Sequence, residues 1–313
     1  MAQAKQDMGT GSIKKLMLQL MIPAVVAQVV NLLYNIVDRI YIGHIAGIGA
    51  AALTGVGLFT PILMLLNAFA MLVGAGGAPR TAIALGQGDR QQAEKIISNS
   101  FTVLMLFAVV LTIGFYAGAP ALLRLFGASD ATLPYALSYS RIYILGSVFV
   151  LLVLGMNPFI TTQGFAKTSM LTTVIGAVIN IILDPILIFG MFGMPAMGVA
   201  GAAIATVGGQ IIAMIFSIVV VVLREHAVRI TFRGFRPHWR TVRDIYTVGL
   251  PAIVMQSIGT VMTMALNGIL SAFSTAAYTV FGLYFKLQSF VFMPVFGLNN
   301  GMVPILSYNY GER

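Results

Sequence analysis

Residues 168–190 read TSMLTTVIGAVINIILDPILIFG, and this stretch decides the fold class. It contains a single charged residue, Asp184. At a rise of about 1.5 Å per residue, a helix over this stretch crosses the roughly 30 Å hydrocarbon core of a bilayer. The stretch therefore predicts a transmembrane helix with an acid inside it.

The rest of the chain has the same apolar character. Hydrophobic residues make up 58% of its 313 residues and charged residues 9%, where a soluble domain carries about 25% charged residues. We therefore predict an all-α polytopic membrane protein with eight transmembrane helices. The predicted spans are 16–42, 50–79, 96–119, 135–161, 168–190, 198–223, 246–270 and 278–306.

Several classes of site are excluded by what the chain lacks. It has no cysteine, which removes disulfides, thiolate metal sites and cysteine nucleophiles. His44, His226 and His238 are too scattered for a zinc cluster. The first span is too long for the core of a signal peptide. We expect no enzymatic activity and no cofactor.

The basic residues alternate between the two sides of the predicted spans. One side carries 14 of the 18 lysines and arginines, while the loops 43–49, 191–197 and 271–277 carry none. The positive-inside rule then places the N-terminus in the cytoplasm, with the chain in the cell membrane. The residues on that side are Lys5, Lys14, Lys15, Arg80, Arg90, Lys95, Lys167, Arg224, Arg229, Arg233, Arg236, Arg240, Arg243 and Arg313.

The longest polar segment, 224–245, divides the chain into two parts. Residues 1–223 form a predicted N-lobe of six spans, and 246–313 begin a C-lobe with two spans. The arginines of the linker are suited to anionic lipid headgroups. Nucleic-acid binding is a weak alternative that we do not expect.

The chain contains an internal repeat. Ile22–Gln28 is echoed by Leu250–Gln256, at an offset of 228, and Ala78-Pro79 by Val303-Pro304, at an offset of 225. Six spans separate the repeats, so both halves have the same orientation in the membrane, as in transporters built from parallel repeats. A complete second half needs six spans, and we expect this chain to be part of a twelve-span protein.

Two acids, Asp38 and Asp184, lie inside the predicted spans. A carboxylate in the membrane is costly, so it marks a functional site by default and is expected to be protonated or paired. Arg39 is adjacent to Asp38, and Arg141 lies near the same side of the membrane. The alternative role for polar residues in spans is to hold helices together.

Polar residues accompany both acids at helical spacing. In the first span the polar residues are 3, 4 and 3 positions apart, and in the fifth span 4, 3 and 4 positions apart, so each set lies on one helix face. We expect these faces to point into the bundle. Both acids then lie within roughly 10 Å of the outer boundary, where one cavity can hold both. The sets are Gln28, Asn31, Asn35 and Asp38; Thr173, Ala177, Asn180 and Asp184; and Thr206 with Gln210.

Two further features accompany the acids. Pro185 removes the amide hydrogen that would bond to Ile181, which suits ion coordination or a hinge. Tyr139 lies in the fourth span, and either lines the cavity or belongs to the interfacial aromatic belt.

Three segments resemble the multidrug and toxic compound extrusion (MATE) family. Asn180–Gly190 followed by Gly198–Thr206 resembles its fifth-to-sixth span signature. The run from Ile22-Pro23 to Asp38 and Gly43 resembles its first span, and Ala84–Asp89 its second-to-third loop. The resemblance covers the whole chain, and the fifth-span motif is the most specific part of it.

The resemblance implies twelve spans in two lobes, alternating access, and export of amphipathic organic cations in exchange for protons or sodium. It implies that Asp38 and Asp184 couple the ion, that Asn180 and Thr206 assist or hold sodium with them, and that the first span bends at Pro23. No other metal is implied. The partners are organic cations, the coupling ion and membrane lipids, and we expect a monomer.

The seventh span departs from the pattern of those sodium-coupled members of the family that carry an acid in this span. Its polar face carries no carboxylate, so an ion site in the C-lobe is not expected here and coupling through the N-lobe is favoured. The residues of this face are Gln256, Thr260, Thr263 and Asn267.

Three alternatives to a cation antiporter remain. A lipid-linked oligosaccharide flippase of similar architecture predicts a more cationic cavity than two acids provide. A two-aspartate membrane protease requires sequence contexts that Asp38 and Asp184 do not have. A non-transporting scaffold or receptor gives no reason for two intramembrane acids.

Overall fold

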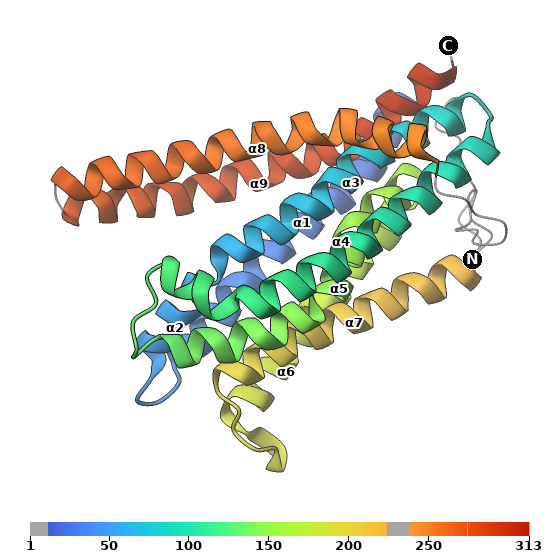
Figure 1. Cartoon of the computed structure of the whole chain (residues 1–313). Helices are drawn as coiled ribbons and strands as arrows, with labels where there is room; N and C mark the ends of the chain where they lie inside the picture. Colours follow the sequence, from blue (N-terminus) through green and yellow to red (C-terminus); the bar gives the residue numbers. More distant parts are fainter. Residues whose placement is uncertain (1–11, 224–237, 274, 313) are drawn as a thin grey trace.

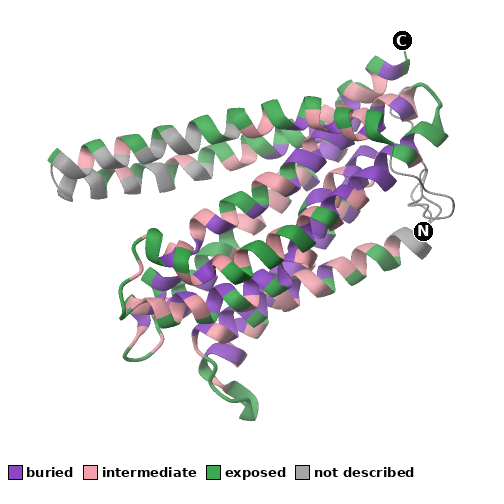
Figure 2. Ribbon diagram, in the orientation of Figure 1, coloured by how far each residue is buried: buried purple, intermediate pink, exposed green. Residues whose placement is uncertain are grey.

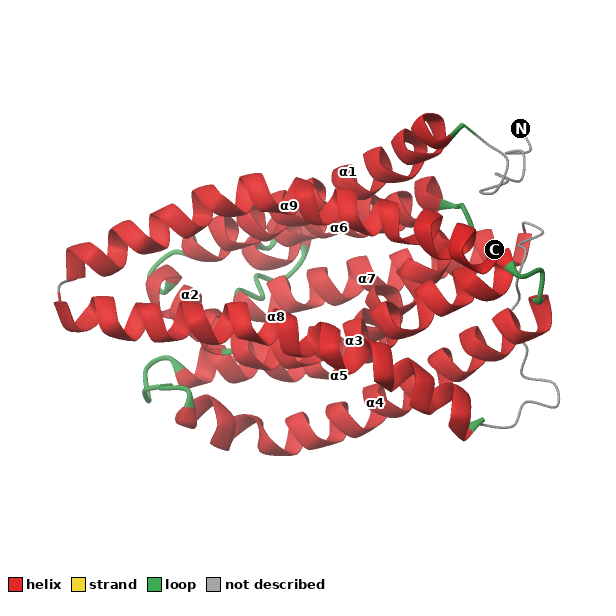
Figure 3. Cartoon of the chain, turned by 90° about the horizontal axis from the view of Figure 1, so that it is seen from above, coloured by secondary structure: helices red, strands yellow, loops and turns green. Residues whose placement is uncertain are grey.

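The computed structural model describes residues 12–223, 238–273 and 275–312, and within α8 and α9 it describes only part of the side chains. The described chain is helical throughout (Figure 3), which confirms the all-α prediction. Its elements are α1 (Ile13–Gly43), α2 (Gly49–Leu58), α3 (Thr60–Gly86), α4 (Arg90–Leu125), α5 (Leu133–Thr162), α6 (Ala166–Phe189), the short 3-10 helix η1 (Met191–Gly193), α7 (Val199–Leu223), α8 (Trp239–Phe273) and α9 (Thr275–Glu312).

Every predicted span lies within this helical framework, and the second is divided. α2 ends at Leu58 and α3 begins at Thr60, with Phe59 between them. Pro61 stands at the start of α3. A proline has no amide hydrogen to donate to the preceding turn, so it favours a new helix start at this point.

Within the described residues, six helical stretches are long and apolar enough to cross a membrane by length and composition. They comprise α1, the continuous region Gly49–Gly86, α4, α5, α6 and Val199–Val220 of α7. α8 and α9 have 35 and 38 residues, which at about 1.5 Å per residue also exceeds the thickness of a bilayer core. The chain is a multi-pass membrane protein.

Several helices extend beyond the predicted spans. α4 begins at Arg90, α8 at Trp239, and α9 continues to Glu312. Glu94, Asp244 and Glu312, which lie outside the predicted spans, are therefore in helical turns at the ends of the spans. Polar residues continue a helix readily once it has left the apolar region. At the start of α4, Asp89 accepts a hydrogen bond from the amide of Gln92 (2.8 Å).

The helices run between two ends of an elongated bundle (Figure 1). We call the end where α1 begins and α9 ends the near end, and the opposite end, with the connections after α1, α4 and α6, the far end. Basic side chains gather at the near end, where those of Lys14, Lys15, Arg90, Lys95, Lys167, Arg240 and Arg243 are exposed. The segment 224–237, most of the predicted linker, lies outside the described residues.

Buried residues concentrate inside the bundle of α1–α7 (Figure 2). One cluster includes Phe59, Tyr139 and Tyr143, together with small residues such as Ala202 and Ala203. Large apolar side chains are exposed along the outer faces of the helices. This distribution is expected for a bundle in lipid, where small residues and polar groups hold helices together and apolar side chains face outward.

α8 and α9 form a hairpin that packs on α3 and α1 near one end and diverges from the bundle toward the far end (Figure 1). We call the contact of α8 and α9 with α3 and α1 the seam. Glycines allow the helices to approach closely there. A Cβ at Gly86 would overlap the carbonyl of Tyr308 on α9, and a Cβ at Gly311 would overlap that of Ile83 on α3. The backbones of the two helices are therefore in direct contact.

The seam has the symmetry that the sequence repeat requires. Ile83 and Gly86 lie 225 residues before Tyr308 and Gly311, and each glycine packs against the other helix. This reciprocal contact is what a twofold axis between equivalent helices produces. The repeat in the sequence thus corresponds to two equivalent helix pairs, with α3 matching α9 and α1 matching α8.

Candidate functional site

The two intramembrane acids meet inside the bundle. Asp38 of α1 is 8% exposed and Asp184 of α6 is 0% exposed, and their carboxyl groups lie close enough to interact electrostatically. Two neighbouring carboxylates in a buried environment repel each other, which favours a proton on one of them. The arrangement is an interacting pair of acids in an apolar bundle.

Asn180 connects the acid pair to α7. Its Nδ2 donates to Asp184 Oδ1 (3.3 Å) and to Thr206 Oγ1 (3.2 Å). The Thr206 hydroxyl in turn donates to the backbone carbonyl of Ala202 (3.0 Å). Since Asn180 precedes Asp184 by one helical turn, both side chains project from the same face of α6, as the spacing predicted.

Tyrosines form one wall of the site. Tyr139 of α5 is buried and lies beside Thr206. Its ring stacks on that of Tyr143, with centroids 5.9 Å apart, and Phe59 packs edge-on against both. Tyr139 therefore lies in the bundle interior.

Several oxygens in this region accept no hydrogen bond within the described chain. They belong to both acids, to Asn180 and to Gln210, which lies one turn beyond Thr206 on α7. A buried acceptor without a partner costs about 1–3 kcal/mol. All four are acceptors, so a proton donor or a cation satisfies them and another acceptor does not. The atoms are Asp38 Oδ1, Asp184 Oδ2, Asn180 Oδ1 and Gln210 Oε1.

The other residues predicted on α1 occupy different environments. Gln28 and Asn31 are half-buried, whereas Asn35 is exposed. The Asn35 amide donates to the backbone oxygen and to the side-chain oxygen of Asn31, at 2.7 and 2.9 Å. Among these three, Asn35 is thus the most exposed, and its amide is bound within its own helix.

The two prolines lie within continuous helices. Pro23 is buried inside α1, and Pro185 is half-buried inside α6. Neither helix ends at its proline. The predicted hinges therefore stay predictions, since a hinge concerns a second conformation.

The basic residues near the acids remain outside the site. Arg39 interacts electrostatically with Asp38, but its side chain is exposed. Arg141 is also exposed, and among the described residues no ion pair joins it to either acid. The polar face predicted on the seventh span lies outside the described side chains.

Two tyrosines of the site were missed by the sequence analysis. Tyr34 interacts electrostatically with both acids, and Tyr143 interacts with Asp38 and Tyr34. A signal was present, because Tyr34 precedes Asp38 by four residues and Tyr143 follows Tyr139 by four. Spacing of this kind places each tyrosine on the same helix face as a predicted site residue. Within the described chain no three acidic or histidine side chains cluster as a metal site.

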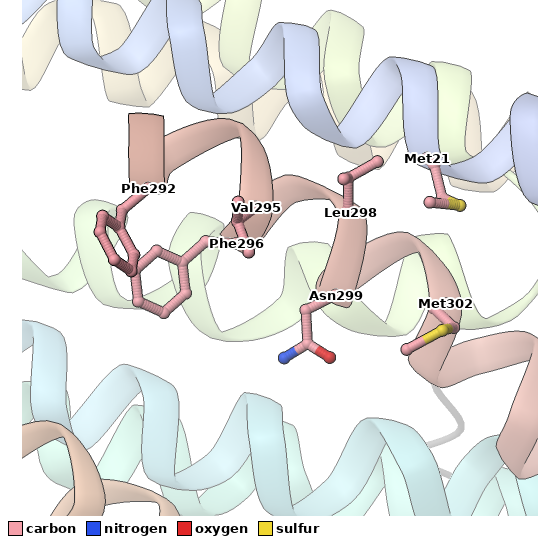
Figure 4. Close-up of a pocket in the computed structure, with 7 residues that line it drawn as sticks. All are labelled: Met21, Phe292, Val295, Phe296, Leu298, Asn299 and Met302. Carbon is pink, nitrogen blue, oxygen red and sulfur yellow. The ribbon is translucent and has the colours of Figure 1, made fainter. Parts of the chain in front are cut away.

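An apolar groove of about 460 Å³ lies along α9 beside α1. Phe292, Phe296 and Asn299 are spaced at four and three residues, and Figure 4 shows Phe296 and Asn299 projecting to the same side of α9. Met21 is 17 positions before Asp38 on α1, about 25 Å along the helix. The groove is therefore separate from the acid pair. Its lining residues are Met21, Phe292, Val295, Phe296, Leu298, Asn299 and Met302.

Comparison with known proteins agrees with this architecture. The model of the MatE family matches residues 23–186. The multidrug export protein MepA of Staphylococcus haemolyticus is 29% identical over 302 residues, which cover 96% of this chain and 65% of that protein. The chain thus spans slightly less than two thirds of the length of this relative.

Solved structures give the same result. A MATE transporter in the straight conformation superposes with a TM-score of 0.89 at 29% identity, covering 96% of this chain and 66% of that one. A multidrug resistance MATE family transporter of the MOP superfamily, in an outward-facing conformation, has a TM-score of 0.87 at 28% identity, with the same coverage. The matched family segment contains both acids and Asn180, and the chain belongs to the MatE family, whose signature its fifth and sixth spans resemble.

Proposed function

We propose that this chain takes part in the export of amphipathic organic cations in exchange for protons or sodium, by alternating access. The observation that carries the proposal is the contact between Asp38 and Asp184 inside the bundle. Two neighbouring acids in an apolar environment are poised to change charge when an ion arrives or leaves. The similarity to MepA, a multidrug export protein, supports the substrate class.

The site offers ligands for either coupling ion. A proton satisfies the pair by itself. For sodium, the carboxyl oxygens of Asp38 and Asp184, the free Asn180 oxygen and the Thr206 hydroxyl form a set of oxygen donors, which hard cations prefer. Tyr139 lies beside Thr206, and Gln210 extends the polar region along α7.

Binding of the ion neutralises the acids and thereby favours a second arrangement of the helices. We assign the bending to Pro23 in α1 and Pro185 in α6, where the proline removes one hydrogen bond of the helix. Gln28, Asn31 and Asn35 are then the polar groups of α1 that change surroundings. The site returns to its charged state when the ion leaves on the opposite side of the membrane.

The position of the chain in the membrane follows from its charges. The exposed basic side chains at the near end favour contact with the cytoplasm. We therefore propose a cytoplasmic N-terminus in the cell membrane, an N-lobe over 1–223, a linker over 224–245 and the start of a C-lobe over 246–313. We propose a monomer without enzymatic activity or cofactor.

The groove along α9 is suited to the apolar part of an organic cation. Phenylalanine rings attract cations through their faces, and Met21 and Met302 can adapt to different shapes. The acids and the groove then serve different purposes, one for charge and the other for apolar contact.

The test is ethidium efflux from cells that express the full-length protein, comparing wild type with Asp184→Asn. The matched control is Asp130→Asn, which removes an acid from an exposed position in the loop after α4. Efflux is measured with a proton uncoupler and, separately, without sodium. We expect efflux to fall by about tenfold or more in Asp184→Asn and to persist in Asp130→Asn.

The two ionic conditions identify the coupling ion. Loss of efflux with the uncoupler indicates proton exchange, and loss without sodium indicates sodium at the same acids. Normal efflux in Asp184→Asn would assign this residue a structural role. Absence of efflux in well-expressed wild type, together with binding of lipid-linked sugar, would replace the proposal by the flippase function.

A further inference from the structure

The connection between α6 and α7 differs from an ordinary surface loop. Residues 191–197, MFGMPAM, contain no charged or hydrogen-bonding side chain, and all seven residues are exposed. Phe192 is 86% exposed. Loops at an aqueous surface are normally polar, and a contiguous exposed apolar segment indicates an interaction.

The backbone holds the phenylalanine outward. Phe192 has φ 57°, and it is the one residue other than glycine with positive φ in the described chain. This conformation is uncommon for a bulky side chain. Gly190 and Gly193, on either side of it, also have positive φ. The exposed ring of Phe192 makes no contact within the fold that would offset the strain of its backbone. The stabilising contact therefore has to come from a partner outside the chain.

The base of the loop is firmly attached to the helices. Met197 donates its amide hydrogen to the carbonyl of Leu187 (2.9 Å), and Gly198 donates to that of Ile188 (3.1 Å). A Cβ at Gly201 would overlap the carbonyl of Leu187, so α7 starts in direct contact with α6. The apolar tip is thus presented by a well-ordered hairpin, which Figure 1 shows projecting from the far end of the bundle.

The lipid-facing surface of α6 leads directly into this tip. Leu171, Val178, Ile182 and Phe189 are exposed, and their spacings of 7, 4 and 7 place them in one stripe along the helix. The stripe continues without a polar residue into Met191 and Phe192. Since the side of α6 that carries these residues faces lipid, the same lipid is the nearest apolar partner of the loop.

The connection between α4 and α5, at the same end, lacks this character. In the loop 126–132, Ser129 donates its amide hydrogen to Thr132 Oγ1 (3.0 Å), and Asp130 is fully exposed. This loop is suited to water. The contrast between two loops at one end of the bundle argues that the apolar loop has a specific partner.

We propose that residues 189–197 form a membrane anchor that inserts into the lipid leaflet at the far end, with Phe192 at its tip. Apolar side chains at the ends of membrane elements bury themselves at the boundary between headgroups and acyl chains. The anchor holds the hairpin of α6 and α7, which carries Asp184, Asn180 and Thr206. The leaflet is therefore mechanically connected to the acid pair.

A direct optical test is possible, because the single tryptophan of these 313 residues, Trp239, is the first residue of α8, and α8 begins at the near end. In a Trp239→Phe background, a tryptophan is introduced at three positions: Phe192→Trp in the loop, Ile182→Trp in the lipid-facing stripe, and Asp130→Trp in the polar loop. The proteins are reconstituted into vesicles of phosphatidylcholine, with and without brominated acyl chains, and their fluorescence is recorded.

We expect the brominated lipid to quench Phe192→Trp nearly as strongly as Ile182→Trp, with blue-shifted emission, while Asp130→Trp stays red-shifted and unquenched. Two results overturn the proposal. Red-shifted emission of Phe192→Trp that is quenched by aqueous iodide places the loop in water. Blue-shifted emission without quenching by the brominated lipid places Phe192 against protein. The readout does not depend on transport.

Discussion

The interior of the bundle and the seam with the α8–α9 hairpin each contain a pair of ionisable side chains, and the two pairs differ in sign of charge and in burial. Inside, Asp38 and Asp184 have the same charge type, are buried, and interact with each other. At the seam, Arg80 of α3 and Asp244 of α8 form an ion pair of opposite charges at 2.9 Å, with a third to a half of each side chain exposed.

The interior pair is therefore a candidate ion-binding site, whereas the seam pair is a structural contact. The seam pair is electrically satisfied and partly hydrated, so nothing about it has to change when an ion or a substrate binds. The interior pair is satisfied only by a proton or a cation, so its state depends on what is bound. The seam is held by glycine contacts between backbones, and its ion pair adds little.

The largest expected effect tests whether the interior acids work as one unit. Asp38→Asn and Asp184→Asn are each expected to reduce efflux by about tenfold or more, because a change of about 1.4 kcal/mol in ion binding is already a factor of ten. If the two acids share one proton, Asp38→Asn combined with Asp184→Asn is no worse than either single variant. Efflux of all three variants, measured at equal expression, checks this.

Additive losses in the double variant would mean that the acids bind independently. In that case the contact between their carboxyl groups does not describe the working site. Asp244→Asn serves as the control from the seam, where an acid is removed without disturbing the interior pair. We expect it to retain efflux.

The second effect concerns the glycine contacts of the seam. Gly86→Ala is expected to destabilise the protein by about 1–3 kcal/mol, since the new Cβ overlaps the Tyr308 carbonyl and forces α3 and α9 apart. The matched control is Gly114→Ala in α4, where a Cβ meets nothing within 4 Å. This control is expected to be neutral, or stabilising by up to about 1 kcal/mol.

Thermal unfolding in detergent compares the two alanine variants with wild type. Equal melting temperatures for Gly86→Ala and Gly114→Ala would show that the helices at the seam separate without cost. The seam would then not depend on close backbone contact.

The sequence predicts the helical framework and the chemistry of the site better than it predicts the exact contacts. Asp38, Asp184, Asn180 and Thr206 were identified from spacing and resemblance, and the structure brings them together. The reason is that helical periodicity determines which side chains share a face, and a carboxyl group in an apolar span has few alternatives to the bundle interior.

Asn35 shows where periodicity stops being sufficient. It shares a face with Asp38 by spacing, yet it is exposed and bonds to Asn31 of its own helix. Which part of a helix face is covered depends on where neighbouring helices cross it, and this is a property of the tertiary packing. The seam likewise depends on glycines from helices far apart in the sequence.

A smaller effect concerns the support of the acid pair. Thr206→Val removes the oxygen that accepts from Asn180 and contacts Tyr139, and is expected to cost about 1 kcal/mol, the typical net value of such a hydrogen bond. Thr54→Val is the control, because this hydroxyl lies on the exposed face of α2 and donates only to Ala50. Equal stability of the two variants in thermal unfolding would mean that Thr206 does not hold Asn180 in place.

The smallest effect is expected at the seam ion pair. A double-mutant cycle with Arg80→Ala and Asp244→Ala is expected to give a coupling energy of about 0.2–1 kcal/mol, because both groups keep part of their hydration. The coupling should fall at molar salt, where the screening length is about 3 Å. Chemical denaturation at low and high salt measures both quantities. A larger coupling energy that does not fall at high salt would contradict this assignment of the two roles. The ion pair would then hold the hairpin on the bundle, and the glycines would only permit the contact.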